Sequence, residues 1–279
     1  MSELTQALAN VDAFEATASR AVAWRLDRGQ TLQRIRALLR QPDLINQRGL
    51  SACAPAVFFR IWFARDPVAA AGFSCGLLRD GSAPIGSLIV APSSKLLGQD
   101  YSTLRAATDA AHPNMTPEGA DWMLLSALRD SENIWFDYTG EPFTLGDMVA
   151  GLTLPSTLVG WLSATNRYSS VTDDTSVVTV GSKQRLPGLI PTSNVDHICL
   201  VSSSFDSNLY PSPQNGQPSG LAGAHIPDHY ILMTAPLAEG NNAVWLNIEF
   251  WSWGRTVKGW TGSTQFFSKC FGAITATAR

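Results

Sequence analysis

Two residues with chemically useful side chains stand close together just before an apolar stretch. Gln47 precedes Cys53 by six positions, and Cys53 leads into the apolar residues 57–63, a run of helical length. A thiol at the start of a helix lies at the positive end of the helix dipole, which stabilises the thiolate and makes it a nucleophile. Gln47 could then donate a side-chain N–H to an oxyanion. The alternative for Cys53 is the role of a small buried apolar residue.

A thiol nucleophile needs a base, and histidine is the usual one. The chain has four histidines, His112, His197, His225 and His229. The first and third lie in loops, and the second lies inside an apolar run, where a structural role is expected. His229 is the best candidate because it follows an aspartate and begins the apolar segment 229–234.

The residues after His229 predict a β-hairpin. Glu239-Gly240-Asn241-Asn242 is a strong turn sequence, and residues 244–251 form the next apolar segment. A hairpin centred near residue 240 places residues 249–251 opposite His229. The sequence Trp251-Ser252-Trp253-Gly254 then predicts a tight turn beside this histidine.

This order of residues resembles the papain-like cysteine peptidase superfamily. A glutamine six positions before a cysteine that begins a helix, a late Asp-His that begins a strand, and a Ser-Trp-Gly after the next strand carry the resemblance. It spans residues 47–254. The resemblance implies that Cys53 is the nucleophile, Gln47 the oxyanion donor, His229 the general base and Trp253 the tryptophan that shields the histidine.

Within this superfamily, the chain looks most like the papain-fold effectors of bacteria. Residues 46–55 are similar to their nucleophile segment, residues 120–123 to their middle helix, and residues 228–232 with 251–254 to their final hairpin. The resemblance therefore implies an α+β, papain-like fold, in which an N-terminal helical lobe packs on a C-terminal antiparallel β-sheet.

Two positions differ from the family pattern. The sequence Cys-Gly-Ser-Cys-Trp is absent around Cys53, and Trp251 stands where the family has the asparagine that orients the histidine. Residues two and four positions before Trp251 share its face of a strand, so Glu249 is the first candidate for the orienting acceptor and Asn247 the second. The alternatives are a Cys-His dyad without a third residue and a solvated polar strand face.

The order of predicted elements also indicates an α+β chain. Apolar residues recur at helical spacing in residues 1–40, 53–63, 116–129 and 155–162. Runs that predict strands follow at residues 177–180, 195–201, 229–234, 244–251 and 266–275. Residues 85–91 predict a short strand or a buried segment, and residues 202–223 a long loop. We expect one domain over residues 1–279, with a mainly helical lobe at about 1–165 and a mainly β lobe at about 175–279.

Composition argues against several classes of function. With 279 residues, 45% of them hydrophobic, and a net charge of −3, the chain lacks the basic charge that favours nucleic acid or an acidic membrane. The four cysteines are scattered without the spacing of a zinc site, so we expect reduced thiols, no metal and no cofactor. Arg60 and Arg65 interrupt the longest apolar run, which argues against stable membrane insertion, and the N-terminal residues lack a secretory signal.

The resemblance implies a cysteine (thiol) hydrolase that cleaves amide bonds, first of all a peptidase that acts as a bacterial effector or toxin. A glutamine deamidase and a peptidoglycan amidase use the same thiol chemistry and stay open. The alternative from another class is a catalytically silent papain-fold binding protein, which Trp251 favours. The expected partner is a protein or peptide substrate, with an immunity or inhibitor protein as a further candidate. Such a chain would be made in the bacterial cytoplasm without a Sec signal and then secreted or delivered into a target cell.

Overall fold

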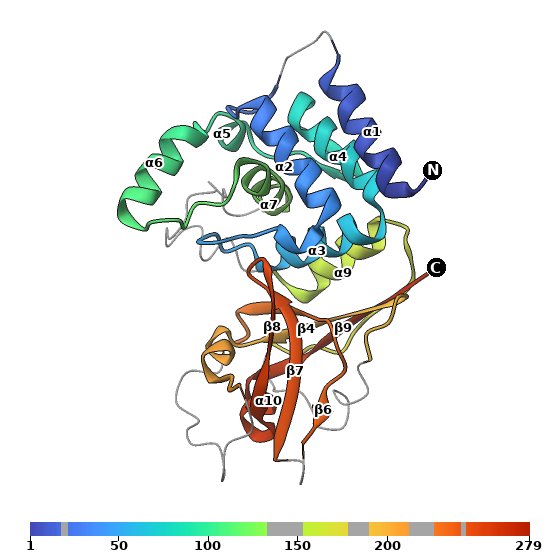
Figure 1. The fold of residues 1–279 in the computed structure, drawn as a ribbon, viewed down its shortest axis with the longest axis vertical. Helices are drawn as coiled ribbons and strands as arrows, with labels where there is room; N and C mark the ends of the chain where they lie inside the picture. Colours follow the sequence, from blue (N-terminus) through green and yellow to red (C-terminus); the bar gives the residue numbers. More distant parts are fainter. Residues whose placement is uncertain (18–21, 133–152, 178–189, 212–225, 241–243) are drawn as a thin grey trace. The chain divides into compact units, whose positions relative to one another are not determined.

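The computed structural model describes the chain except for residues 18–21, 133–152, 178–189, 212–225 and 241–243. Contacts between Cα atoms divide the chain into two compact units, Met1–Arg167 and Tyr168–Arg279. The described part of the first unit consists of helices and one hairpin, and the second contains an antiparallel sheet (Figure 1). The predicted α+β class is therefore confirmed. That both units form one papain-like domain stays a prediction.

Helices make up most of the first unit. They are α1 (Glu3–Glu15), α2 (Arg28–Arg40), α3 (Cys53–Arg65), α4 (Pro67–Asp80), α5 (Ser94–Leu97), α6 (Tyr101–Ala111), α7 (Gly119–Ser131) and α9 (Pro155–Ala164), with a 3₁₀ turn, η1 (Pro42–Leu44). Aspartate side chains cap α2, α4 and α6, where each accepts a backbone N–H of the first turn. Proline occupies the first turn of α4 and of α9, where its missing N–H costs no helical hydrogen bond.

The helix that begins at Cys53 lies in the core of the first unit. Residues 54–63 of α3 are buried except Arg60, which is the pattern of a helix packed on all sides. Phe58 contacts Trp161 of α9, with ring centroids 6.0 Å apart, and Trp62 contacts Phe73 of α4 at 5.3 Å. Neighbouring helices therefore fix the position of α3 within this unit.

Residues 85–91 belong to a two-stranded hairpin of β1 (Ala83–Ile85) and β2 (Leu88–Val90). The turn of this hairpin lies against the end of α9, where the N–H of Ser87 donates to the carbonyl oxygen of Ala164 at 3.3 Å. Gly86 has a φ of 55°, and a Cβ at this position would lie 1.7 Å from the same oxygen. The close approach of hairpin and helix thus requires glycine.

The second unit is built on one antiparallel sheet. Its strands are β3 (Tyr168–Asp173), β4 (Val195–Val201), β5 (His229–Met233), β6 (Ala238–Glu239), β7 (Trp245–Ser252), β8 (Arg255–Gly262) and β9 (Cys270–Ala278). Among the described residues, β9 pairs with both β3 and β4, β4 pairs with β5, and β5 pairs with the end of β7. The short β6 pairs with the beginning of β7. β8 pairs with β7 along its full length.

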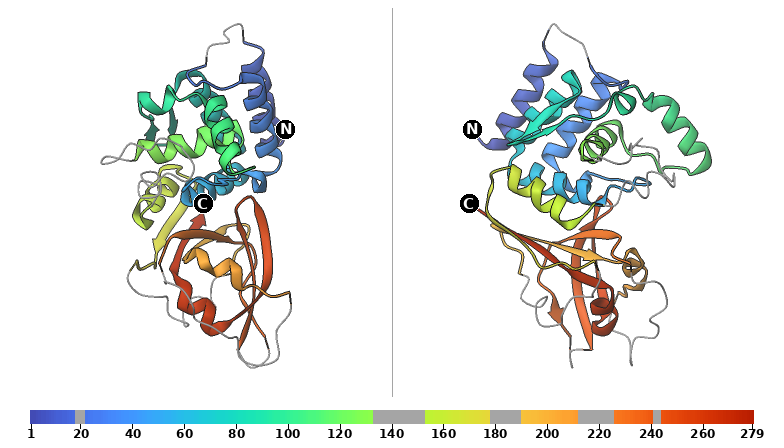
Figure 2. Two further views of the ribbon diagram at one scale, coloured as in Figure 1. Left: turned by 90° about the vertical axis from the view of Figure 1, so that its left-hand side faces the viewer. Right: turned by 180° about the vertical axis from the view of Figure 1, so that it is seen from behind.

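The core of the second unit includes one face of this sheet and the helix α10 (Ser263–Lys269). Phe266 and Phe267 of α10 belong to the same apolar cluster as Ile231, Ile248 and Phe250 of the strands. Figure 2 shows α10 beside the strands of the sheet. The predicted strand at residues 266–275 is therefore wrong in its first part, because β9 begins only at Cys270. A short apolar run does not by itself distinguish a strand from a buried helix.

The other strand predictions compare well where the structure describes them. Those at residues 195–201, 229–234 and 244–251 are confirmed by β4, β5 and β7, each within one residue. Parts of three predicted segments lie outside the described residues, namely the strand at 177–180, the turn at 239–242 and the loop at 202–223. The described part of this loop begins with a 3₁₀ helix, η3 (Ser203–Asn208).

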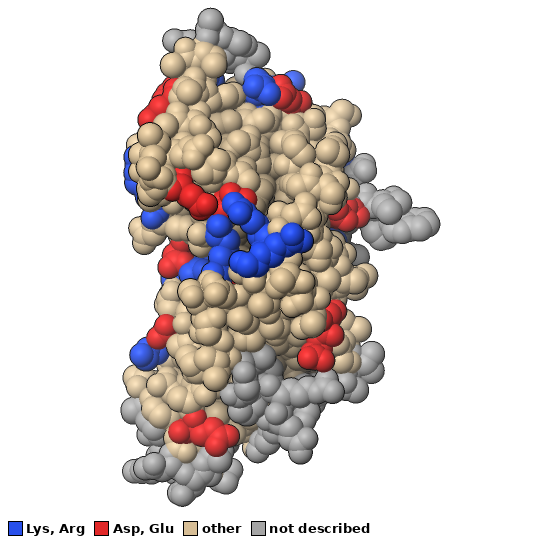
Figure 3. Space-filling model, turned by 90° about the vertical axis from the view of Figure 1, so that its right-hand side faces the viewer, with Lys and Arg blue, Asp and Glu red and all other residues tan. Residues whose placement is uncertain are grey.

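Charged side chains of both signs are interspersed on the face drawn in Figure 3, where acidic groups flank the basic ones. This arrangement agrees with the near balance of 20 basic and 23 acidic residues. None of the described helices combines the length and the apolar character that crossing a membrane demands.

Candidate functional site

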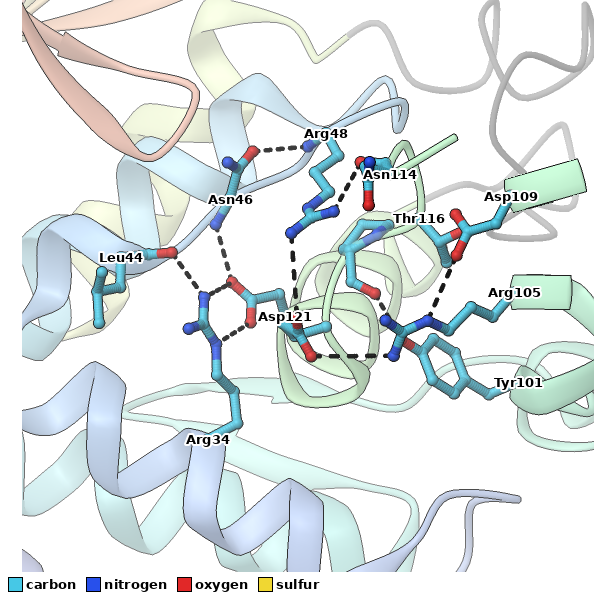
Figure 4. A network of polar contacts seen from close by, with 12 residues as sticks. Arg34, Leu44, Asn46, Arg48, Tyr101, Arg105, Asp109, Asn114, Thr116 and Asp121 are labelled. Atoms are coloured by element: carbon cyan, nitrogen blue, oxygen red, sulfur yellow. Dashed lines mark hydrogen bonds and ion pairs between the residues drawn. The ribbon is translucent and has the colours of Figure 1, made fainter. Parts of the chain in front are cut away.

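A buried carboxylate fixes the segment that leads to Cys53. Asp121 of α7 is fully buried, and its two oxygens accept hydrogen bonds from Arg34 of α2 at 2.7 and 3.2 Å. Asp121 also accepts the backbone N–H of Asn46 at 2.8 Å, while Arg34 donates to the carbonyl oxygen of Leu44 at 2.7 Å (Figure 4). These charge-assisted bonds hold the backbone directly before Gln47.

The next residues are tied to the segment that precedes α7. The backbone of Arg48 has a left-handed φ of 47°, and its N–H donates to Oδ1 of Asn46 at 2.8 Å. The guanidinium of Arg48 donates to the carbonyl oxygen of Asn114 at 2.6 Å, as Figure 4 shows, and Gly49 N–H donates to that of Met115 at 3.0 Å. The loop between η1 and α3 is thus held at several points along its backbone.

Gln47 and Cys53 are presented by this loop and by the helix that follows it. Cys53 is the first residue of α3, as predicted, and no side chain of the described residues caps that helix N-terminus. Cys53 is partly exposed, whereas Cys75, Cys199 and Cys270 are buried. Gln47 is 7% exposed, and its Oε1 has no hydrogen-bond partner among the described residues. Cys53 is therefore the most exposed of the four thiols, and it stands at the N-terminus of a helix.

His229 begins β5 and is enclosed by two side chains of the neighbouring hairpin. The ring is 4% exposed, and its Nε2 lies 2.7 Å from Oγ of Ser252. The indole of Trp253 stacks on the ring with a centroid distance of 4.1 Å and an angle of 9° between the planes. Trp253 and Gly254 have φ values of 46° and 74° and form the two-residue turn between β7 and β8. The predicted tight turn beside the histidine is present.

Burial lowers the pKa of His229 to about 3. The cause is desolvation of the charged ring, which the neutral hydroxyl of Ser252 does not offset. The ring is therefore uncharged at pH 7, and a neutral imidazole has one nitrogen that can accept a proton. Nδ1 makes no hydrogen bond to any residue that the structure describes.

Ser252, rather than Glu249, is the residue at hydrogen-bond distance from His229. Oε1 of Glu249 accepts a bond from the hydroxyl of Thr234 at 3.1 Å, and its other oxygen lies 3.5 Å from Nζ of Lys258. Thr234 follows the end of β5, whereas His229 begins that strand. The contact with His229 that was expected of Glu249 is therefore made by Ser252.

The register of the strands explains this difference. We expected residues 249–251 opposite His229, but Trp251 pairs with Leu232, three residues further along β5. The same register, continued, places the Trp253-Gly254 turn opposite His229. Asn247 is further away still, because it pairs with Ala238 of β6.

Strand alternation contributes a second reason. We expected an orienting residue on the strand face of Trp251, which Glu249 shares. Ser252 projects to the opposite face, together with the buried Phe250 and Ile248. The sequence signal that could have indicated Ser252 is its position directly before Trp253 and Gly254.

Asp228, the aspartate that drew attention to His229, has a structural role of its own. Its carboxylate accepts the backbone N–H and the hydroxyl of Ser203 at 2.6 and 2.8 Å. Its own N–H donates to the carbonyl oxygen of Val201, the residue that pairs with His229 across β4 and β5. Asp228 thus ties the end of β4 to the start of β5 and holds the backbone of the histidine.

The remaining candidates lie apart from this arrangement. Nδ1 of His197 lies 2.9 Å from the hydroxyl of Thr275 on the neighbouring strand, and burial lowers the pKa of this histidine, which agrees with the structural role expected for it. The described residues contain no group of three His, Cys, Asp or Glu side chains that could hold a metal ion.

Gln47 and Cys53 belong to the first unit, and His229, Ser252 and Trp253 to the second. The thiol expected as nucleophile and the histidine expected as base therefore belong to different units. Comparisons with family models, with curated proteins and with solved structures gave no match to this chain.

Proposed function

We propose that this protein is a cysteine hydrolase of papain-like fold, in which Cys53 is the nucleophile and His229 the base. The setting of His229 supports the proposal most strongly. Ser252 holds Nε2, Trp253 covers one ring face, and Nδ1 has no hydrogen bond to a described residue. A base held in one orientation with a free nitrogen is what general-base catalysis needs. The partly exposed thiol of Cys53 is the matching nucleophile.

The reaction requires the Cys53 thiol of the first unit to meet His229 of the second. Nδ1 accepts the thiol proton, and the thiolate attacks the carbonyl carbon of an amide. The backbone N–H of Cys53 and the side chain of Gln47 stabilise the negative oxygen that forms. The C–N bond breaks while the protonated ring returns its proton to the leaving amine. Water then hydrolyses the thioester and restores the thiol.

Electrostatics couple the charges of the two groups. Because burial lowers the pKa of His229 to about 3, the protonated ring is stable at neutral pH only beside an anion. The Cys53 thiolate would be that anion. Proton transfer and thiolate formation are thus one event, and the ion pair forms only when the two residues are in contact.

Peptide bonds are the first substrate that we propose. Glutamine side-chain amides and the amide bonds of peptidoglycan undergo the same attack, so a panel of peptides, a glutamine-containing protein and muropeptides separates the three classes. As an effector or toxin, the protein would act in another cell and would be countered by an immunity or inhibitor protein. Its expression in the target compartment should then inhibit growth, and Cys53→Ala should abolish the inhibition.

The partnership of Cys53 and His229 is tested by alkylation with iodoacetamide. At pH 7 an ordinary thiol with a pKa near ~8.5 is only a few per cent ionised, whereas a thiol paired with imidazole is largely thiolate. The substitution His229→Gln should therefore slow alkylation of Cys53 by about tenfold or more. His197→Gln, at another buried histidine of the same sheet, is the matched control and should leave the rate unchanged.

Hydrolysis provides the second readout. Cys53→Ala should abolish turnover, and Gln47→Ala should lower kcat by about 10²–10³-fold, the usual cost of losing one oxyanion donor. The melting temperature of each variant shows whether it is folded. Full hydrolysis by Cys53→Ala would contradict the proposal. An alkylation rate of Cys53 that is the same in His229→Gln as in the original chain would contradict it as well.

A catalytically silent binding protein is the second candidate. The low pKa of His229 favours it, because a base that resists protonation is a weak acceptor when no thiolate lies beside it. In that case Cys53 should react with iodoacetamide as an ordinary exposed thiol in both the original chain and His229→Gln, and no substrate of the panel should be turned over.

A further inference from the structure

The first unit contains a polar cavity of about 500 Å³, lined by residues of α2, α6 and the start of α7 and by the residues before α2. Three arginines and three acidic residues line it: Arg25, Arg34, Arg105, Asp27, Asp109 and Glu118. A volume of this size is typical of sites for small molecules. None of the residues proposed for hydrolysis lines this cavity, so its role is a separate question.

Two of the three arginines have hydrogen-bond donors to spare. Arg25 is exposed and forms no ion pair within the described part of the chain. Arg105 lies 3.5 Å from Asp109 and 4.0 Å from Glu118, distances longer than the 2.7 Å between Arg34 and Asp121 (Figure 4). Arg34 is committed to Asp121, whereas Arg25 and Arg105 can donate to a ligand.

The acidic residues keep acceptor capacity as well. Asp27 uses Oδ1 to cap α2 through the N–H of Gln30, at 2.7 Å, and its other oxygen accepts no bond from a described residue. Glu118 is 42% exposed and reaches Arg48 and Arg105 only at 3.9 and 4.0 Å. The cavity thus offers both donors and acceptors that carry charge.

We propose that this cavity binds a small zwitterion, a molecule with one carboxylate and one ammonium group, such as an amino acid or a dipeptide. A simple anion would meet three carboxylates there, and a simple cation would meet three guanidinium groups. A zwitterion satisfies both sets, with its carboxylate on Arg25 and Arg105 and its ammonium on Asp27 and Glu118.

The apolar part of the wall suits the remainder of such a ligand. Tyr101, Leu26 and Ala106 line the cavity beside the charged groups. The hydroxyl of Tyr101 donates to the carbonyl oxygen of Pro117 at 2.5 Å, so its ring is held in place and its polar end is already satisfied. A short aliphatic chain between the two charges would pack on this surface.

Calorimetric titration of the full chain carrying Cys53→Ala tests this proposal without any turnover. Glycylglycine carries both charges, N-acetylglycine only the carboxylate, and glycinamide only the ammonium. Glycylglycine should bind at least tenfold more tightly than either singly charged compound, and more tightly than inorganic phosphate. Arg25→Gln should weaken its binding by about fivefold or more, because the carboxylate loses a charged donor.

Arg79→Gln is the matched control, since Arg79 is exposed, pairs with Asp80 and does not line the cavity. This variant should bind glycylglycine as the parent chain does. Arg25 forms no ion pair with a described residue, so its replacement does not threaten folding, and Arg105→Gln adds an independent check. Absence of glycylglycine binding, equal binding of a singly charged compound, stronger binding of phosphate, or unchanged affinity in Arg25→Gln overturns the proposal. None of these results depends on whether Cys53 is a nucleophile.

Discussion

At His229, burial disfavours the charged ring, and no charged group in the described part of the chain compensates. Its enclosure by Ser252 and Trp253 lowers the pKa to about 3, so the folded protein keeps the ring neutral over most of the acid range. The unfolded chain has no such enclosure, and its histidine titrates near ~6.5. The difference in proton binding makes the stability of the fold depend on pH.

Lowering the pH from 7 to 5 should therefore reduce the free energy of unfolding through His229 alone. Below pH 6.5 the unfolded chain binds a proton that the folded ring does not accept until about pH 3, so stability is lost as the pH falls through this window. Between pH 7 and 5 the loss is about 2 kcal/mol. Urea unfolding at both pH values should show a smaller loss in His229→Gln. Equal losses in the two proteins would mean that the buried ring accepts protons readily.

The sequence predicts the identity of some site residues better than their contacts. Cys53 at a helix start and Trp253 beside His229 follow from residue order, and both are seen in the structure. Residue order could not predict that Ser252 contacts the His229 ring. This contact depends on the pairing of β5 with β7, which differs by three residues from the expected register. A side chain that ends its strand, as Ser252 does, gives no periodic pattern.

The hairpin of β1 and β2 depends on one glycine. Gly86 allows the turn to approach the last carbonyl groups of α9, and Ala164 accepts the N–H of Ser87 there. Helix α9 in turn contacts α3 through Trp161 and Phe58. The hairpin, α9 and the helix of Cys53 are therefore linked by successive contacts.

Gly86→Ala should destabilise the first unit by more than about 2 kcal/mol, because the added Cβ would clash with a backbone oxygen and the positive φ adds strain. Gly160→Ala, inside α9, is the matched control. Nothing lies within 4 Å of a Cβ at that position, so it should stabilise the helix by up to about 1 kcal/mol. Urea unfolding of both variants measures the difference. A mild effect of Gly86→Ala would show that the hairpin moves freely relative to α9.

A hydrophobic pattern predicts an element correctly when burial within that one type of element accounts for its apolar residues. Residues 195–201 are mostly apolar because both faces of β4 are covered, and they are correctly predicted as a strand. The predicted strand at residues 266–275 fails at its start because Phe266 and Phe267 pack as helix residues against the sheet. The polar β3 is mostly exposed, and a strand of this kind carries almost no hydrophobic signal.

The boundary between the two units can be located by expressing fragments of the chain. The structure divides the chain after Arg167, whereas the sequence suggests a β lobe that starts near residue 175. Residues 168–173 form β3, which pairs with β9, and Arg279 donates to the carbonyl oxygen of Tyr168 at 3.1 Å.

A fragment of residues 168–279 should therefore be more stable than one of residues 175–279, by several degrees in melting temperature, because the shorter fragment exposes an edge of β9. The fragment 1–167 should unfold cooperatively with a helical circular-dichroism spectrum. The full chain serves as the reference for both. Equal melting temperatures of the two β fragments would place β3 outside the cooperative unit.

The position of β9 also sets the order in which the chain can fold during its synthesis. β3 begins at Tyr168 and β4 at Val195, yet both pair with a strand that begins only at Cys270. At roughly 5–20 residues per second, β3 leaves the ribosome on the order of 5–20 seconds before its partner exists. The helical unit forms from segments already made, whereas the sheet cannot be completed until β9 has been made. During that interval β3 lacks its partner and β4 lacks one of its two, which is when a chaperone would have most to protect.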